Sequence, residues 1–137
     1  MRYLGVDYGD VRTGLAVSDP SALLASGIGY IKESGMRHTA QKVAEQARKH
    51  GVGQIVVGYP KNMDGSEGSR TEVVRAFVEL LKAETDLPII LFDERLSTME
   101  AHRFLSLTDT RGKKRKQVVD TLSAQIILQD FLDRQKR

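Results

Sequence analysis

The order of its short apolar segments constrains the fold of this 137-residue chain more than any other feature. Residues alternate or run apolar over Arg2–Tyr8, break at Gly9-Asp10 and resume over Thr13–Ser18, which predicts two strands joined by a tight turn. Ser26–Lys32 predicts a third strand after a short loop. The chain is therefore expected to begin with an antiparallel group of three strands.

The apolar period then changes to that of a helix. Apolar residues over 37–50 recur at i, i+3, i+4 and i+7, and Gly51 supplies a stop signal. A second helix is predicted over 72–84. The stripes expected to face the core are Ala40, Val43, Ala44 and Ala47 in the first helix, and Val73, Ala76, Phe77 and Leu80 in the second.

Each of these helices is followed by a short strand. Gln54–Tyr59 is apolar and β-branched, and Pro88–Phe92 has the pattern of a buried, non-alternating strand. Ser97-Thr98-Met99-Glu100 fits a capping box at the start of a helix, and a final helix is predicted over Lys116–Arg134. This order predicts a single α/β domain over residues 1–137, with a five-stranded mixed sheet flanked by about four helices. Three of its strands are antiparallel, and the last two are parallel.

Composition excludes several classes of protein. The chain has 40% apolar and 28% charged residues and no Cys, which excludes disulfides, thiolate zinc sites and thiol nucleophiles. Its longest apolar runs fall far short of the ~20 residues that span a bilayer, and its first residues are unlike a secretory signal. We therefore expect a cytoplasmic protein that does not contact a membrane. His38, His50 and His102 show no metal-ligand spacing and are expected on the surface or on helices.

Positive charge is concentrated near the C-terminus. Residues 1–110 carry a net charge of −2, whereas residues 111–137 carry +5. Half of the eight cations in the second part form one continuous run, Lys113, Lys114, Arg115 and Lys116. Such a density suits a polyphosphate partner, because each contacted phosphate releases counterions. A solvated, mobile loop explains the same run about as well.

Carboxylates mark the ends of two predicted strands. Asp7 ends the first strand, and Asp93-Glu94-Arg95 follows the most apolar strand, at the edge where open α/β sheets place ligands. From spacing alone, Asp7 could instead cap its own turn, and Asp93-Glu94-Arg95 could form a solvated loop with an internal ion pair.

A third candidate carboxylate lies on the last helix. At about 100° per residue, Asp120 shares a face with Ala124, Ile127 and Phe131, which are expected in the core. Because an unpaired buried charge is costly, Asp120 should be bonded to a donor, be protonated or face a metal ion. If this helix packs across the sheet edge, the three acidic positions can form a site for Mg²⁺ or Mn²⁺. Two such ions, ~4 Å apart, can drive phosphodiester hydrolysis by activating water and stabilising the leaving oxygen.

Candidate phosphate-binding groups lie in the loop before the second helix. Residues 58–70 offer backbone N–H groups and hydroxyls together with Lys61 and Arg70, although a mobile surface loop would have the same composition. Arg12 and Arg95 are further candidates for contact with nucleic acid. No Walker A sequence or complete dinucleotide fingerprint is present, so no nucleotide cofactor is expected.

Four sequence blocks, in order, resemble the YqgF/RuvX family and span nearly the whole chain. Tyr8 and Tyr59 depart from the family pattern only at positions where the family tolerates several apolar residues. The blocks are Gly5-Val6-Asp7-Tyr8-Gly9 with Arg12, Gly14, Ser18 and Asp19; Val57-Gly58-Tyr59-Pro60 with Asn62-Met63-Asp64-Gly65; Asp93-Glu94-Arg95-Leu96-Ser97-Thr98; and Asp120 with Ser123-Ala124 and Ile127-Leu128.

The resemblance implies an RNase H-like fold, akin to the RuvC resolvases. It places an acidic catalytic triad at Asp7, Glu94 and Asp120, with Asp93 as a neighbouring alternative ligand. It also implies a metal-dependent nuclease that acts at the 5′ end of precursor 16S ribosomal RNA.

Two alternatives to this function remain. Some family members are described as Holliday junction resolvases, and paired cuts in a two-fold symmetric junction call for a homodimer, whereas trimming of precursor RNA does not. The other alternative is a non-catalytic factor that holds structured RNA. An actin-like ATPase is disfavoured because that fold needs two related domains.

Overall fold

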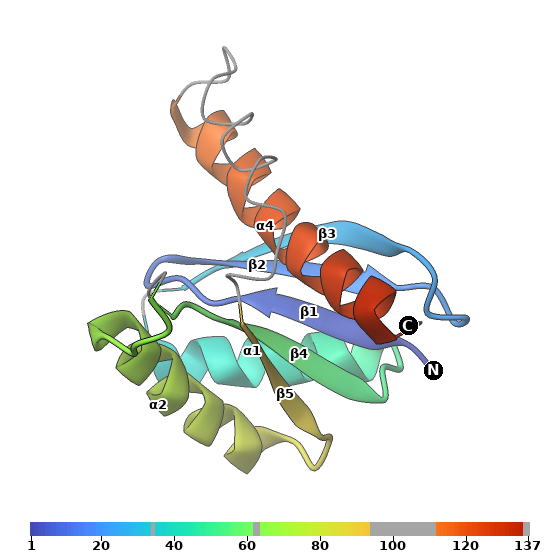
Figure 1. Cartoon of the computed structure of the whole chain (residues 1–137), viewed down its shortest axis with the longest axis horizontal. Coiled ribbons are helices and arrows are strands. Elements are labelled where there is room, and N and C mark those ends of the chain that lie inside the picture. The colour runs from blue at the N-terminus through green and yellow to red at the C-terminus, as the bar shows by residue number, and fades with distance from the viewer. Residues whose placement is uncertain (34, 62–63, 94–111, 136–137) are drawn as a thin grey trace.

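The computed structural model describes residues 1–33, 35–61, 64–93 and 112–135, and for residues 112–120 it describes the helix without the side chains. The strands form one sheet, and helices cover both of its faces (Figure 1). The elements in chain order are β1 (Tyr3–Asp7), β2 (Arg12–Ser18), β3 (Ala25–Lys32), α1 (Met36–Lys49), β4 (Gln54–Tyr59), α2 (Ser69–Glu84), β5 (Ile89–Asp93) and α4 (Gly112–Gln135).

The five strands form one mixed sheet in the order β3-β2-β1-β4-β5. β1 pairs antiparallel with β2, which pairs antiparallel with β3, whereas β1–β4 and β4–β5 are parallel. This arrangement confirms the predicted mixed sheet. It also makes β1 the central strand, so its carboxyl end is flanked by a strand on each side.

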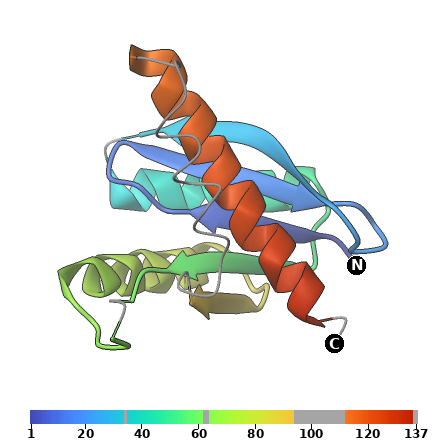
Figure 2. The same ribbon diagram turned by 45° about the horizontal axis from the view of Figure 1, so that its top comes forward.

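The sheet separates two layers of helices. α1 and α2 pack on one face, and α4 crosses the other face diagonally (Figures 1 and 2). We call these the α1/α2 face and the α4 face. Successive side chains of a strand point to opposite faces of the sheet. If one residue contacts α4, the residues directly before and after it therefore point to the α1/α2 face.

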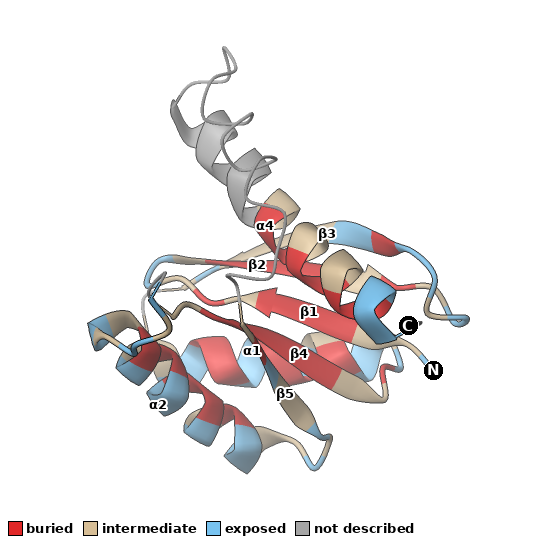
Figure 3. Cartoon of the chain, in the orientation of Figure 1, coloured by how far each residue is buried: buried red, intermediate tan, exposed pale blue. Residues whose placement is uncertain are grey.

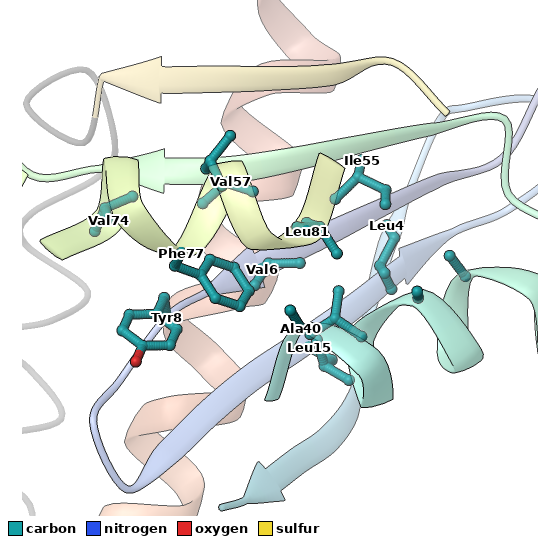
Figure 4. Close-up of a cluster of buried hydrophobic side chains, with 14 of the residues drawn as sticks. Leu4, Val6, Tyr8, Leu15, Ala40, Ile55, Val57, Val74, Phe77 and Leu81 are labelled. Carbon is teal, nitrogen blue, oxygen red and sulfur yellow. The ribbon is translucent and has the colours of Figure 1, made fainter. Parts of the chain in front are cut away.

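The larger part of the core lies on the α1/α2 face (Figure 4). Phe77 of α2 is fully buried, and its ring stacks on that of Tyr8 at a centroid separation of 4.4 Å. The predicted stripe of α1 is confirmed, because Ala40, Val43, Ala44 and Ala47 are all buried.

The predicted stripe of α2 is wrong by one position. Phe77 is buried as expected, but Ala76 is exposed, and Val73 and Leu80 are only half-buried. The helix is rotated so that the residues one position after the predicted ones face the sheet. The buried residues are Thr71, Val74, Phe77, Val78 and Leu81. Both stripes fit the sequence, and contact with the sheet selects the one with larger aliphatic side chains.

On the α4 face, the helix lies unusually close to the central strand. A Cβ atom added to Gly5 would lie 2.8 Å from Cβ of Leu128, closer than such atoms approach in real structures. Ala124, Leu128 and Phe131 of α4 are buried, and the ring of Phe131 packs edge-on against Tyr3 at 5.4 Å. Figure 3 shows buried residues both on α4 and on the strands that it crosses. The glycine in β1 therefore allows α4 to dock directly on the strand that ends in Asp7.

Two other expectations need correction. α4 begins at Gly112, not at Lys116, so the basic run from Lys113 to Lys116 is helical and not a loop. Lys and Arg are good helix formers, and no breaker follows Gly112. β5 is not fully buried, because it is an edge strand in which Leu91 is 42% exposed. The predicted capping box at 97–100, and with it the fourth predicted helix, lies outside the described residues.

The loop between β2 and β3 is organised by one carboxylate. Oδ1 of Asp19 accepts hydrogen bonds from the backbone N–H groups of Leu23 (2.7 Å) and Leu24 (2.8 Å), and Oδ2 accepts from Ser21. These donors, Leu24 most of all, hold the pKa of the Asp19 carboxyl well below its usual range. Asp19 is therefore ionised in the folded chain at any ordinary pH.

We expect Asp19→Asn to lower the melting temperature in a pH-dependent way. The folded-state pKa is depressed, so the wild-type advantage is complete above the unfolded-state pKa of about 4 and is lost as the pH falls through the lower folded-state value. Melting temperatures of both proteins at pH 7, 5 and 3 measure this. A gap of constant size at all three pH values would contradict the assignment.

Within the described ranges, no helix combines the length and the apolar character needed to cross a bilayer.

Candidate functional site

Asp7 lies at the carboxyl end of the central strand and faces α4. Tyr3 and Gly5, which alternate with it along β1, both contact residues of α4, whereas Leu4 and Val6 lie in the core on the opposite face. Alternation therefore places Asp7 on the α4 face, where it is half-buried. This position, at the carboxyl ends of parallel strands, is where open α/β sheets bind ligands.

Glycines flank Asp7 on both neighbouring strands. Gly14 of β2 is its register partner. On the other side, Val6 pairs with Val57, so the next residue of β4, Gly58, is level with Asp7. Neither strand places a side chain beside the carboxylate in this row, and both glycines are buried.

The turn that follows Asp7 is tightly constrained. The hydroxyl of Thr13 donates to the Gly9 carbonyl and accepts from the Gly9 N–H, both at 3.3 Å. Arg70, at the start of α2, donates to the Tyr8 carbonyl oxygen at 2.7 Å and to Asp10 at 3.1 Å. These contacts fix the backbone on both sides of the turn and so fix the position of Asp7.

Tyr8 has a structural role in this turn. Burial, reinforced by the nearby Asp10 carboxylate and opposed by Arg70, raises the pKa of the Tyr8 hydroxyl. The Arg70 guanidinium lies 5.6 Å from the centroid of the Tyr8 ring. The tyrosine is therefore neutral at ordinary pH and serves as a packing surface between Phe77 and Arg70.

Asp93 reaches the same edge of the sheet but points to the other face. It pairs with Tyr59 at the end of β5, two strands from β1, which corresponds to about 10 Å. Phe92, the residue before it, packs on Phe131 of α4 at 6.1 Å, so alternation turns Asp93 toward the α1/α2 face. Among the two predicted neighbours, Asp93 is thus the less suited to share a ligand with Asp7.

The other two predicted carboxylates lie where the structure describes no side chains. Glu94 lies outside the described residues, and Asp120 lies in the part of α4 described without side chains. The face predicted for Asp120 is confirmed for its helical neighbours, because Ala124, Ile127 and Phe131 are all buried. Among described side chains, no three His, Cys, Asp or Glu residues come together as metal ligands.

The predicted phosphate-binding residues have different surroundings. Arg12 begins β2 on the α4 face, two residues before Gly14, whereas the guanidinium of Arg70 is engaged by the turn. Lys61 follows β4 and is half-buried. Arg95 lies outside the described residues, and for Lys113, Lys114, Arg115 and Lys116 only the helical backbone is described.

The loop that carries Lys61 is anchored where it meets β4 and α2. The Tyr59 hydroxyl donates to Glu67, and Glu67 also pairs with Arg75 of α2 at 2.5 Å. Burial raises the pKa of the Tyr59 hydroxyl, and the hydrogen bond to Glu67 raises it further.

The described histidines lie where the sequence predicts them. His38 is exposed on α1 and His50 caps the C-terminus of that helix, while His102 falls outside the described residues.

Sequence reasoning missed two groups near Asp7. It gave no role to the flanking glycines, Gly14 and Gly58, although both occur in the blocks that resemble the family. It also missed Tyr30 and Lys32 of β3, which share the α4 face with Asp7 because Tyr30 pairs with Gly14 and Lys32 pairs with Arg12. Register between strands was the signal needed, and a single sequence does not contain it.

Comparison with known proteins agrees with this fold. The family model described as "RuvX: Holliday junction resolvase" matches residues 1–134. A Geobacillus sp. protein named "Putative pre-16S rRNA nuclease" is 46% identical over 135 residues, covering 97% of this chain and 98% of that protein. A protein of the same name from Pelotomaculum thermopropionicum is 44% identical over 138 residues, covering 100% of this chain and 90% of its own length.

A solved structure shows the fold independently. T. thermophilus RuvC in complex with a Holliday junction substrate superposes with a TM-score of 0.61 at 16% identity, covering 99% of this chain and 96% of that one. At this identity the likeness establishes the fold alone, and the family follows from the sequence matches. The chain therefore belongs to the RuvX family of nucleases and carries its RNase H-like fold.

Proposed function

We propose that this chain is a single-domain, divalent-metal-dependent nuclease that hydrolyses phosphodiester bonds in the 5′-end processing of precursor 16S ribosomal RNA. The observation that carries the proposal is the position of Asp7 on the α4 face, at the carboxyl end of the central strand, between two glycines. Its full-length relatives bear the name of such a nuclease.

The donor set fits a hard cation. Asp7 offers carboxylate oxygens, the ligands that Mg²⁺ and Mn²⁺ prefer, in a half-buried position. Glu94 and Asp120 complete the proposed ligand set. Glu94 is preferred to Asp93 because Asp93 lies on the face opposite to Asp7. Asp120 precedes Ala124 by one helical turn, and Ala124 contacts Gly5. Asp7 lies two residues after Gly5 in β1, which supports Asp120 as a neighbour of Asp7.

In this proposal the protein holds the substrate and positions the acidic groups. Bound divalent ions, of which we expect two, supply an activated water and stabilise the leaving oxygen. The Thr13 and Arg70 contacts keep Asp7 in place as the substrate arrives. Arg12, Lys61, Arg95 and the basic run at Lys113–Lys116 neutralise phosphates of the nucleic acid backbone, and Arg70 contributes positive charge at the same edge.

The direct test is a cleavage assay on a matched panel. Purified protein is incubated in Mg²⁺, Mn²⁺ or EDTA with a precursor 16S 5′-end RNA, a duplex DNA and a four-way junction. We expect cleavage of the precursor RNA with either metal and none in EDTA. Absence of cleavage on every substrate, with no thermal stabilisation by either metal, would leave the chain as a structured-RNA-binding factor.

A second candidate function is resolution of Holliday junctions. It is favoured by the description of the family model and by the fold shared with RuvC. Paired cuts across a two-fold symmetric junction require a homodimer. A stable dimer in sedimentation, with symmetric cuts in the junction, would favour this function, whereas a monomer that cuts only the precursor RNA would favour the first.

A further inference from the structure

We infer that three residues of β2 and β3, Arg12, Tyr30 and Lys32, bind a single-stranded stretch of the nucleic acid substrate beside Asp7. We call this set the strand lane. The inference deepens the proposed function, on which it rests, by placing a substrate-binding surface on one side of the candidate active site and by stating its chemistry: phosphates on the two cations and a base on the aromatic ring.

Strand register places the three residues on the same face as Asp7. Directly paired residues of antiparallel strands point to the same side of a sheet. Asp7 pairs with Gly14, Gly14 pairs with Tyr30, and Arg12 pairs with Lys32 in the adjoining row. Ile31, between Tyr30 and Lys32, packs into the core on the opposite face, which confirms the direction of both neighbours.

The helix on this face leaves the lane uncovered by its described side chains. α4 crosses β3 at Gly27, where an added Cβ would lie 2.3 Å from Thr121, three residues before Tyr30. Beyond this crossing, Tyr30 is half-buried and Lys32 is exposed. Gly14, which is itself buried, separates Tyr30 from Asp7 without a side chain of its own, so Tyr30 and Asp7 lie in one row on this face.

Two acidic residues next to the lane, Asp10 and Glu33, are already paired with other cations. Asp10 is bound by Arg70 at 3.1 Å. Glu33, next to Lys32, pairs with Lys42 of α1 at 2.9 Å and lies within 4.0 Å of His38. Within the described part of the chain, neither Arg12 nor Lys32 has an ion-pair partner. Their positive charges are therefore available to an anion from outside.

Arg12 contributes a buried hydrogen-bond donor to the lane. Its Nε atom is buried and has no hydrogen-bond acceptor in the described structure. A buried N–H without an acceptor costs free energy, and a guanidinium beside a candidate nuclease site is well matched to a phosphate oxygen. Together with Lys32, directly opposite on β3, it provides two cations for a sugar-phosphate backbone.

Tyr30 gives the lane a preference for single strands. An aromatic ring binds any base by stacking, but only if the base is unpaired or splayed out. Phosphate contacts alone do not distinguish single strands from duplexes. The combination of a ring and two cations therefore fits the single-stranded segment at an RNA end or at the branch of a junction.

The test is a binding assay in EDTA, where metal-dependent cleavage cannot occur. The probes are a fluorescein-labelled 12-nucleotide single-stranded RNA and the DNA of the same sequence, followed by fluorescence anisotropy at several salt concentrations. The variants are Arg12→Gln/Lys32→Gln for the cations and Tyr30→Leu for the ring, which keeps apolar bulk without a stacking surface. Thermal unfolding establishes that each variant is folded.

We expect a separate signature from each variant. The double charge variant should weaken binding at least tenfold and reduce the slope of log Kd against log salt by about 0.7 for each phosphate that is no longer neutralised. Tyr30→Leu should weaken binding about tenfold with an unchanged slope, whereas Tyr30→Phe should bind as the wild type does. Weaker binding of both probes would assign the lane to single strands in general, and weaker binding of the RNA alone would assign it to RNA.

A matched control removes the same charge elsewhere. Arg48→Gln/Lys49→Gln lies on exposed positions at the end of α1, on the opposite side of the sheet, and should change binding little. Lane variants that bind no more weakly than this control would overturn the inference. If the wild type cuts in Mg²⁺ while the lane variants bind normally, only the lane is wrong. If the lane variants bind weakly but no protein cuts, the lane stands and the nuclease proposal fails.

Discussion

Asp7→Asn is expected to reduce metal-dependent cleavage on the order of 10³-fold or more. Asparagine has nearly the same shape as aspartate and retains one carbonyl oxygen, but it removes the negative charge that, in our proposal, binds a divalent ion at the end of β1. Metal ions contribute several kcal/mol to such a transition state, and each 1.4 kcal/mol corresponds to about tenfold in rate. Single-turnover cleavage of the most rapidly cut substrate in Mg²⁺ and Mn²⁺ measures the reduction.

Two further measurements make this result specific. Binding of the uncut substrate in EDTA should be unchanged or slightly tighter, because a negative charge near the phosphates has been removed. Asp86→Asn, at an exposed position between α2 and β5, is the matched control and should cut at the wild-type rate. Equal rates for Asp7→Asn and wild type, in a preparation free of contaminating nucleases, would show that Asp7 is not a metal ligand.

Gly9→Ala is expected to destabilise the fold and to abolish most activity in the protein that remains folded. A Cβ atom at this position would lie 2.0 Å from the carbonyl oxygen of Arg12, an atom of the rigid backbone. The turn between Asp7 and Arg12 must therefore change shape. Overpacking of this kind costs about 3 kcal/mol, or about 10 °C in melting temperature for a chain of this size. Calorimetry or circular dichroism on heating measures the shift.

The control for this variant is another glycine in an ordinary conformation. Gly35 has a φ of −105°, and an added Cβ would meet nothing closer than 3.6 Å. Gly35→Ala should therefore be nearly neutral in both stability and cleavage. If Gly9→Ala melts and cuts as Gly35→Ala does, the turn is not the rigid support of Asp7 that its contacts indicate.

Elements governed by local patterns were predictable from the sequence. The hairpin around Gly9, the helix over 37–50 and the three-plus-two mixed sheet all follow from periodicity and turn residues, and each is confirmed. The errors occur where tertiary contact decides. Two apolar stripes of α2 share Phe77, and contact with the sheet selects the one that also contains Val74, Val78 and Leu81. The edge position of β5 likewise depends on strand order and not on its own composition.

The candidate site was predictable only in part for a related reason. The sequence places Asp7 at a strand end, and the structure confirms that position. It does not say which side chains of β2 and β3 share a face with Asp7, because that depends on register between strands. Gly14, Tyr30 and Lys32 became visible only through pairing. Asp93 and Glu94 are adjacent in sequence, and only the contact of Phe92 with α4 shows which face Asp93 takes.

The docking of α4 on Gly5 also bears on how the molecule folds. The β1–β2 hairpin closes over a few residues and can form early, but the contact between Gly5 and Ala124 joins segments separated by more than a hundred residues. Contacts of such long range form late, because a large loop must be closed before they contribute. We therefore expect a partly folded chain to hold a formed hairpin while the candidate site is still incomplete.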